Sequence, residues 1–156
     1  MIAIRHARFP EDRDAVIEIW REYVAFPKTD LSFQSFEAEF ADLPGKYAPP
    51  TGCVLLAWRA DRVVGCIAMR KVDREICEMK RLYVRPEAQG AGLGRHLIEQ
   101  LIAEARNAGY AEMRLDVLAD FSAARHLYEK LGFKPAPAVS HNPLRGAAFL
   151  GLRLVD

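Results

Sequence analysis

A glycine-rich turn between an expected strand and an expected helix constrains the fold of this chain most. Leu82–Val84 ends an apolar strand pattern, and a helical spacing of apolar residues begins at Leu93. Gly90, Gly92 and Gly94 lie at the junction. Because glycine has no Cβ atom, the backbone N–H groups can approach an anion at the positive end of the helix dipole. The junction therefore predicts a site for a phosphorylated ligand.

The spacing of this turn argues against the two commonest nucleotide-binding motifs. It reads Q-x-x-G-x-G from Gln89 to Gly94. A P-loop requires a lysine after its last glycine, whereas Arg95 follows Gly94 here. A dinucleotide-binding fingerprint beginning at Gly90 would need a glycine or alanine where Arg95 stands. A dinucleotide or other nucleotide binder is therefore the weakest of the alternatives.

Composition favours one domain that acts on small molecules. The 156 residues are 51% hydrophobic, which suffices for a full core but not for two ordinary domains, so we expect a single domain over residues 1–156. The net charge of +1 gives no sign of binding to nucleic acid or to a membrane surface.

The cysteine pattern and the apolar runs predict a cytoplasmic protein. Cys53, Cys66 and Cys77 are odd in number, lie in apolar runs and lack Cys-x-x-Cys spacing. This pattern argues against a disulfide framework and a zinc site, so we expect no bound metal. No apolar run approaches the roughly 20 residues of a membrane span, and the first residues do not resemble a signal peptide.

The order of strand and helix patterns is typical of a mixed α/β (α+β) fold. The short turns between the second, third and fourth strands predict an antiparallel meander, and the helix after the fourth strand predicts a parallel fourth and fifth strand. We expect a central sheet of about six to seven strands flanked by about four helices. The expected strands are 2–5, 53–58, 63–70, 75–84, 113–117, from 133 onward and 147–154; the expected helices open at 9–12 and span 31–43, 93–109 and 120–131.

A second motif, ARHLYEKLGF over Ala124–Phe133, accompanies the glycine turn, and the strand before the turn reads EMKRLYV from Glu78 to Val84. With these three segments the chain resembles the GNAT superfamily of acyl-CoA-dependent N-acyltransferases, strongly from Val63 to Phe133 and weakly before Cys53. The resemblance implies the GNAT fold, in which the parallel fourth and fifth strands splay apart to hold acyl-CoA.

The resemblance also implies a reaction and a cofactor site. An acetyl group would pass directly from acetyl-CoA to a primary amine of a small molecule or peptide. Backbone N–H groups of the turn would meet the pyrophosphate, and the pantetheine arm would pair with the fourth strand. Phe121 stands where many members have an asparagine; either Ser122 substitutes for that polar contact or the backbone alone holds the arm. The implied cofactor-binding residues are Leu82, Tyr83, Val84, Gln89, Gly90, Ala91, Gly92, Leu93, Gly94, Arg95 and Ser122.

Two proton transfers need side chains, because an alkylammonium must lose a proton and the departing thiolate must gain one. Glu78 is the candidate base, acting directly or through water, and Tyr128 matches the family's acid position. Each has a structural alternative. Strict alternation would place Glu78 on one face with Lys80 and Leu82, as a surface carboxylate paired with Lys80. Tyr128 is alternatively a core tyrosine.

The sequence says least about the acceptor. Carboxylates in or beside the expected second helix are candidates for attracting a cationic amine, although a solvated helix face explains them as well; they are Asp30, Glu37, Glu39 and Asp42. The proline-rich segment from Pro135 to Gly146, with His141, is a candidate roof over the amine site. Because family members are often dimers, a homodimer is one expectation. A non-catalytic acyl-CoA-binding or sensor module is the alternative function.

Overall fold

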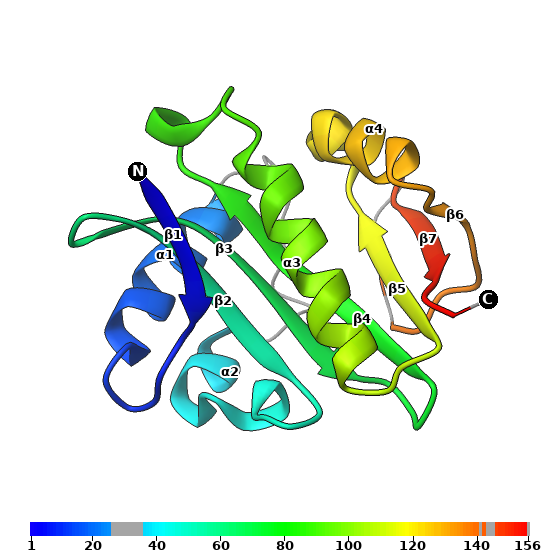
Figure 1. The fold of residues 1–156 in the computed structure, drawn as a ribbon, viewed down its shortest axis with the longest axis horizontal. Helices are drawn as coiled ribbons and strands as arrows, with labels where there is room; N and C mark the ends of the chain where they lie inside the picture. Colours follow the sequence, from blue (N-terminus) through cyan, green and yellow to red (C-terminus); the bar gives the residue numbers. More distant parts are fainter. Residues whose placement is uncertain (26–35, 141, 143–145, 156) are drawn as a thin grey trace.

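The computed structural model describes residues 1–25, 36–140, 142 and 146–155. Within them, seven strands form one sheet in the order β1-β2-β3-β4-β5-β7-β6 (Figure 1). The strands are β1 (Ile2–His6), β2 (Cys53–Arg59), β3 (Arg62–Lys71), β4 (Ile76–Val84), β5 (Glu112–Val117), β6 (Lys134–Pro135) and β7 (Ala148–Arg153). The α-helices are α1 (Arg13–Ala25), α2 (Phe36–Asp42), α3 (Leu93–Asn107) and α4 (Ser122–Lys130).

The strand pairing confirms the expected mixed sheet. Strands β1 to β4 form an antiparallel meander, and β4 pairs in parallel with β5. The last two strands pair antiparallel, with β7 between β5 and β6. The parallel pair follows from the helical connection through α3, because only a long crossover lets a chain return in the same direction.

Two apolar layers cover the two faces of the sheet (Figure 1). On one face α3 buries its apolar stripe, which includes Leu97 and Leu101, against the sheet. On the other face Ile19 and Trp20 of α1 pack with Phe40 of α2. The helical spacing of these apolar residues gives α3 and α1 each one buried face. The aromatic residues of α2 pack in or against the core, as expected.

Several element boundaries differ from the expected ones. Residues 31–35 of the expected second helix, with Ser32 and Phe33, lie outside the described residues, and α2 ends at Asp42. The expected helix over 120–131 is instead a 3₁₀ turn, Ala119–Phe121, followed by α4. The strand expected from residue 133 onward is only the two residues of β6. Gly109 follows the end of α3 with φ +90°, as a left-handed residue after a helix C-terminus does.

A β-bulge in β4 corrects the predicted alternation of side chains. Arg81 has φ +64°, and the register with β3 shifts between Cys66 and Ala68. Before the bulge Met79 packs on the α3 side, and after it Leu82 and Val84 do so too. Leu82 therefore lies on the face opposite to Glu78 and Lys80, not beside them, because the extra residue reverses the alternation.

The same bulge separates β4 from β5. The two strands pair only from Ile76 opposite Glu112 to Glu78 opposite Arg114. Beyond Glu78 they diverge toward the glycine turn and α4 (Figure 1). This is the splay that the GNAT resemblance implies. None of the helices in the described part of the chain is long and apolar enough to cross a membrane.

Candidate acyl-transfer site

The glycine turn presents unpaired backbone donors to open space. Gly90 and Gly92 have φ +90° and +80°, and no heavy atom lies within 4 Å of a Cβ built at either position. Helix α3 begins at Leu93 without a side-chain cap. The first N–H bonded back along the helix is that of His96, to the Gly92 oxygen at 3.1 Å. The N–H groups of Leu93, Gly94 and Arg95 are therefore left for an anion.

A groove of about 610 Å³ runs from this turn to the first residues of α4. Every sequence-predicted cofactor residue except Ala91 lines it, and Ala88, Asp120, Phe121, Ala123, Ala124 and Leu127 complete its walls. The groove thus brings the end of β4 and the glycine turn, which are adjacent in sequence, together with α4, which lies about thirty residues further along the chain. The groove combines backbone N–H groups at the glycine turn with apolar side chains along its walls. This combination suits an elongated ligand that carries a phosphate group.

Three of the polar side chains in the groove differ in how they are held. The Gln89 side chain donates from Nε2 to the Val84 carbonyl oxygen at 2.9 Å, so it braces the turn against the end of β4. Arg95 lines the groove with its side chain about half exposed, and its Nε lies 3.4 Å from Glu99 Oε2. Ser122 begins α4 and lines the groove. Arg95 is therefore the available cation beside the turn.

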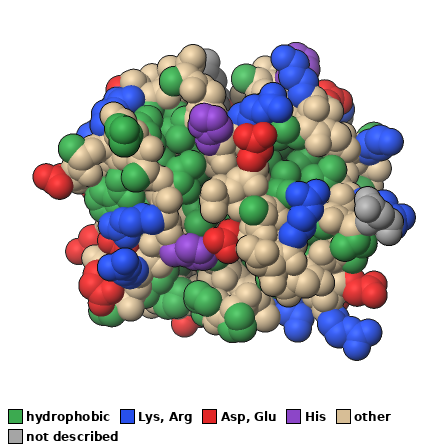
Figure 2. Space-filling model, viewed as in Figure 1, with side chains coloured by type: hydrophobic (Ala, Val, Ile, Leu, Met, Phe, Trp, Pro, Cys, Tyr) green, Lys and Arg blue, Asp and Glu red, His purple; other side chains and the backbone are tan. Residues whose placement is uncertain are grey.

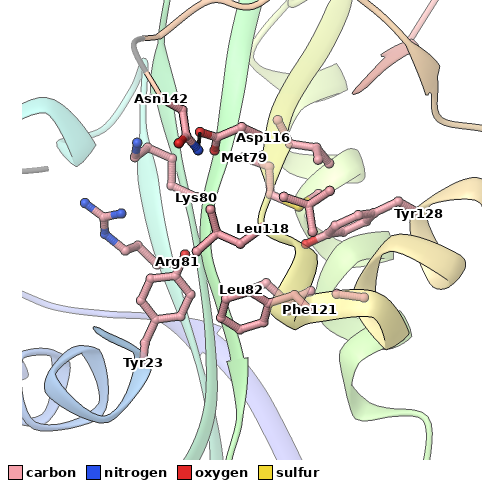
Figure 3. Close-up of a pocket in the computed structure, with 13 residues that line it drawn as sticks. Tyr23, Met79, Lys80, Arg81, Leu82, Asp116, Leu118, Phe121, Tyr128 and Asn142 are labelled. Atoms are coloured by element: carbon pink, nitrogen blue, oxygen red, sulfur yellow. Dashed lines mark hydrogen bonds between the residues drawn. The ribbon is translucent and has the colours of Figure 1, made fainter. Parts of the chain in front are cut away.

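A narrow cleft of about 30 Å³ continues from the groove into the gap between β4 and β5 (Figure 3). Leu82, Phe121 and Ala124 line both spaces, so the groove and the cleft meet at these residues. The cleft is also lined by Tyr23, Met79, Lys80, Arg81, Leu115, Asp116, Val117, Leu118, Tyr128 and Asn142. A volume of this size holds about one water-sized group.

Phe121, at the family's asparagine position, forms an aromatic wall where groove and cleft meet. Its ring stacks on Tyr23 of α1 with centroids 5.8 Å apart and an interplanar angle of 20°. Tyr23 also meets Tyr83 edge to face at 6.5 Å. The stack joins α1 to the start of α4 across the splayed strands. Phe121 thus makes an apolar contact, and its neighbour Ser122, the expected polar substitute, lines the groove.

Tyr128 is brought into the cleft from α4, with its hydroxyl pointing into the gap (Figure 3). Only 6% of the residue is exposed. Burial, and then the nearby Tyr23 and Asp116, raise the pKa of the Tyr128 phenol above its usual value. The phenol therefore stays protonated at neutral pH and can donate a hydrogen bond into the cleft.

Glu78 lies outside the described lining of both the groove and the cleft. It is fully buried, Arg70 Nε donates to its Oε1 at 2.8 Å, and Ser140 Oγ donates to its Oε2 at 2.9 Å. Lys80 Nζ is 3.9 Å away. The surface position expected in the alternative is therefore wrong, because Glu78 is buried, whereas the pairing with Lys80 is present as a long ion pair beside the hydrogen bond from Arg70. A direct role as base stays a prediction.

Sequence reasoning missed two cleft residues, Asp116 and Asn142. Asn142 Nδ2 donates to Asp116 Oδ2 at 2.8 Å, which joins the segment before β7 to β5 (Figure 3). In β5, Met113, Leu115 and Val117 are buried and alternate with polar residues. Asp116 is a polar residue near the end of a strand that was expected to splay from its neighbour, and this position could have identified it as a residue of the gap. No local pattern points to Asn142.

Two of the four acidic residues expected near the acceptor, Glu37 and Glu39, are engaged by other side chains, and Asp42 lines neither the groove nor the cleft. Glu37 binds Arg21, and Glu39 contacts Arg81, Lys46 and Tyr47. Through its ion pair with Arg81, Glu39 is connected to the lining of the cleft. Asp30 and His141 lie outside the described residues.

The three cysteines are free and buried, and burial raises the pKa of each thiol to about 12. A thiol with such a pKa supplies almost no thiolate at neutral pH, so the cysteines are poor candidates for a covalent nucleophile. Among the described residues, no group of His, Cys, Asp and Glu side chains is arranged to hold a metal ion.

Figure 2 shows basic and acidic side chains interspersed over the α3 face.

Comparison with known proteins assigns this architecture. The sequence model of the Acetyltransferase (GNAT) family matches residues 13–133. An uncharacterized N-acetyltransferase of Schizosaccharomyces pombe is 36% identical over 155 residues, covering 98% of this chain and 95% of the relative. An acetyltransferase from Salmonella typhimurium, solved with its cofactor acetyl-CoA, is 28% identical with a TM-score of 0.69, over 99% of this chain and 95% of that one.

A GNAT acetyltransferase structure from Staphylococcus aureus has a TM-score of 0.82 at 18% identity, covering 99% of this chain and 100% of that one. At this identity the likeness concerns the fold alone.

Proposed function

This chain belongs to the GNAT acetyltransferase family, and we propose that it is an acetyl-CoA-dependent N-acetyltransferase acting on a primary amine of a small molecule or peptide. One observation carries the proposal. The groove at the glycine turn and the cleft between β4 and β5 meet, and the buried Tyr128 points into the cleft. A ligand lying along the groove could therefore present its reactive end beside a proton donor.

The groove residues fit coenzyme A in chemistry and shape. The free N–H groups from Leu93 to Arg95 suit a pyrophosphate at a helix N-terminus, and the Arg95 guanidinium adds a positive charge. The backbone of Leu82 and Val84 lies where β4 has lost its β5 partner, so it can pair with the amide groups of a pantetheine arm. Ser122 is a proposed contact at the start of α4.

Acetyl-CoA, when bound, supplies a thioester whose acyl carbon accepts the lone pair of the amine. The ammonium would first lose one proton to a base, which frees the lone pair. As the C–N bond forms and the C–S bond breaks, the nitrogen would lose a second proton, and the departing thiolate would gain one from an acid that this second proton can restore. Tyr128 holds its phenolic proton at neutral pH and lies in the cleft, so we assign it the donation to the sulfur. The buried thiols leave direct transfer as the simplest route.

Two carboxylates are candidates for handling the ammonium proton. Asp116 lines the cleft and one of its oxygens accepts a hydrogen bond from Asn142. Glu78 lies outside the cleft lining and accepts hydrogen bonds from Arg70 and Ser140. We therefore assign the first contact with the ammonium to Asp116 and keep Glu78 as the proposed base, reached through water.

The proposal is tested by calorimetric titration of the protein with acetyl-CoA, NAD and ATP, followed by thiol release with a panel of amines. Selective binding of acetyl-CoA together with amine-dependent thiol release is expected. If acetyl-CoA binds but no amine in the panel causes thiol release, the sensor alternative is favoured. Equal binding of the nucleotides would contradict the groove assignment. The homodimer and the cytoplasmic location remain predictions of the sequence.

A further inference from the structure

We propose that the acceptor is a small aminocarboxylate, with Lys80 binding its carboxylate and Asp116 its ammonium. This inference rests on the proposed acetyl transfer and narrows the acceptor class. It starts from an imbalance in the cleft. Lys80 and Asp116 both line it, yet in the described part of the chain they do not form an ion pair with each other.

Lys80 is a buried cation without a hydrogen-bonded anion in the described part of the chain. Its side chain is 10% exposed, and the nearest carboxylate oxygen, Glu78 Oε1, lies 3.9 Å from Nζ. That separation exceeds hydrogen-bond length. Both oxygens of Glu78 already accept hydrogen bonds, from Arg70 and Ser140. Burying an ammonium without a hydrogen-bonded partner is costly, so a ligand anion at this position would be stabilising.

The other cations nearby are already engaged. The Arg81 guanidinium forms an ion pair with Glu39 and lies over the Phe36 ring, 4.5 Å from its centroid. Lys46 Nζ lies 3.2 Å from Glu39 Oε1. Lys80 is thus the cleft cation best placed to bind an incoming anion.

Asp116 supplies the opposite charge. One oxygen of its carboxylate accepts the Asn142 amide, which leaves the other for an ammonium. In Figure 3 the Lys80 ammonium, Asp116 and Asn142 gather on one side of the cleft, and the Tyr128 hydroxyl enters from α4. An amine held by Asp116 would therefore face the proton donor while a carboxylate on the same molecule reached Lys80.

The small size of the cleft favours a short acceptor. A space of about 30 Å³ holds about one water-sized group, so any acceptor must widen the cleft, and a short acceptor must widen it least. A free amino acid satisfies both charges in a few atoms, whereas a peptide amino terminus offers the ammonium with a neutral amide in place of the carboxylate. An amine that lacks a carboxylate and a peptide amino terminus are therefore the competing acceptors in the test.

The test compares acceptors that differ in the carboxylate. Glycine, β-alanine and γ-aminobutyrate are each paired with the corresponding amide, and thiol release is measured at saturating acetyl-CoA. The three chain lengths sample the spacing between the two charges. We expect at least one acid to have a KM about tenfold or more below that of its amide, as for a charge-assisted hydrogen bond.

Lys80 variants then assign the effect. Lys80→Met should raise the KM of the preferred acid to that of its amide while leaving the KM of the amide unchanged, and Lys80→Arg should keep part of the preference. Lys71→Met, at an exposed position of β3, is the matched control. Melting temperature and the Kd for acetyl-CoA, measured on every variant, report folding and the cofactor groove.

The outcomes separate this inference from the proposed function. If acetyl-CoA binds and the amides or peptides are acetylated as well as the acids, the carboxylate assignment is overturned and the acetyltransferase stands. An equal loss with acid and amide in Lys80→Met also overturns it. If acetyl-CoA does not bind, the proposed function itself fails.

Discussion

The cofactor groove and the acceptor cleft meet at Phe121 but are built in different ways. Much of the groove is backbone from one continuous stretch, Val84–Arg95, whose conformation depends on local glycines and a helix N-terminus. The cleft is lined mainly by side chains from α1, β4, β5, α4 and the segment before β7. A ligand in the groove would meet backbone N–H groups at the start of a helix, whereas a ligand in the cleft would meet charged side chains particular to this chain.

This difference explains why the groove could be predicted from the sequence more completely than the cleft. Backbone N–H groups at a helix start bind anions almost regardless of the neighbouring side chains. The cleft depends on how tightly each charge is paired after folding: Arg81 is hydrogen-bonded to Glu39, whereas Lys80 has only a long ion pair with Glu78. Substitutions in the groove should therefore affect every acceptor equally, and substitutions in the cleft should discriminate among acceptors.

The largest effect is expected from Gly92→Glu. The substitution places a carboxylate beside the donors proposed for the pyrophosphate, at a residue with φ +80°. We expect acetyl-CoA affinity to fall by at least about 100-fold, measured by calorimetry, since a charge-assisted contact is replaced by repulsion. Gly109→Glu is the matched control, because Gly109 also has open surroundings and φ +90° but lies at the other end of α3.

Both glutamates carry a similar left-handed backbone cost of about 1–2 kcal/mol. The two variants should consequently lose similar melting temperature, and only Gly92→Glu should lose the cofactor. Normal acetyl-CoA affinity in Gly92→Glu would show that the pyrophosphate does not lie at this turn.

Tyr128→Phe tests the point where the two halves meet. Removing the phenolic proton donor should lower kcat by roughly 100-fold or more, with little change in the Kd for acetyl-CoA. Tyr110→Phe is the control, because Tyr110 is also buried but its hydroxyl donates to the Thr51 carbonyl oxygen at 2.6 Å and lies outside the lining of the groove and cleft. Equal rates for wild type and Tyr128→Phe would leave Tyr128 as a core residue.

Asp116→Asn and Glu78→Gln sharpen the assignment within the cleft. Asp116→Asn should raise the KM of the acceptor about tenfold, because the ammonium loses a charged hydrogen-bond partner. Glu78→Gln should lower kcat with little change in KM if Glu78 receives the proton through water. Steady-state kinetics at fixed acetyl-CoA measures both. A kcat unaffected by Glu78→Gln would remove Glu78 from the reaction and leave a structural role beside Arg70.

The smallest effect concerns the pH dependence of stability at Lys80. Burial, and then the nearby Arg81, lower the pKa of Lys80 from its usual 10.5 in the folded protein. Between the lowered pKa and 10.5 the unfolded chain binds more protons than the folded one, so folding is stabilised as pH rises. Lys80→Met should therefore melt a few degrees above wild type at neutral pH, with the difference narrowing as the pH increases.

Thermal melts of wild type and Lys80→Met across this pH range check the sign. Lys71→Met, at an exposed lysine, should show no such trend. A constant or widening difference would mean that Lys80 is not destabilised by its burial.

The part of the fold that sequence predicted best is governed by short-range patterns. The α3 stripe, the glycine turn and the order of strands follow from spacing over a few residues, and the structure agrees with them. Helix ends were less accurate at α4, because the 3₁₀ turn Ala119–Phe121 satisfies the same apolar spacing over its short length.

The part of the site that sequence missed depends on contacts between distant segments. Asp116 and Asn142 are 26 residues apart and meet only when β7 lies beside β5. Glu78 looked exposed by alternation and is buried, because Arg70 on the neighbouring strand and Ser140 after β6 cover it. Neither contact leaves a periodic signal.

By itself, the sequence determined the glycine turn, the helix that follows it and the meander before it. Those features rest on glycine conformation, helix termini and side-chain spacing, which act within a few residues. Only the tertiary structure decided which charges face the cleft. The bulge at Arg81 reverses the faces of β4, and the packing of α1, α2 and the segment before β7 determines that Arg81 is paired while Lys80 is not hydrogen-bonded to an anion.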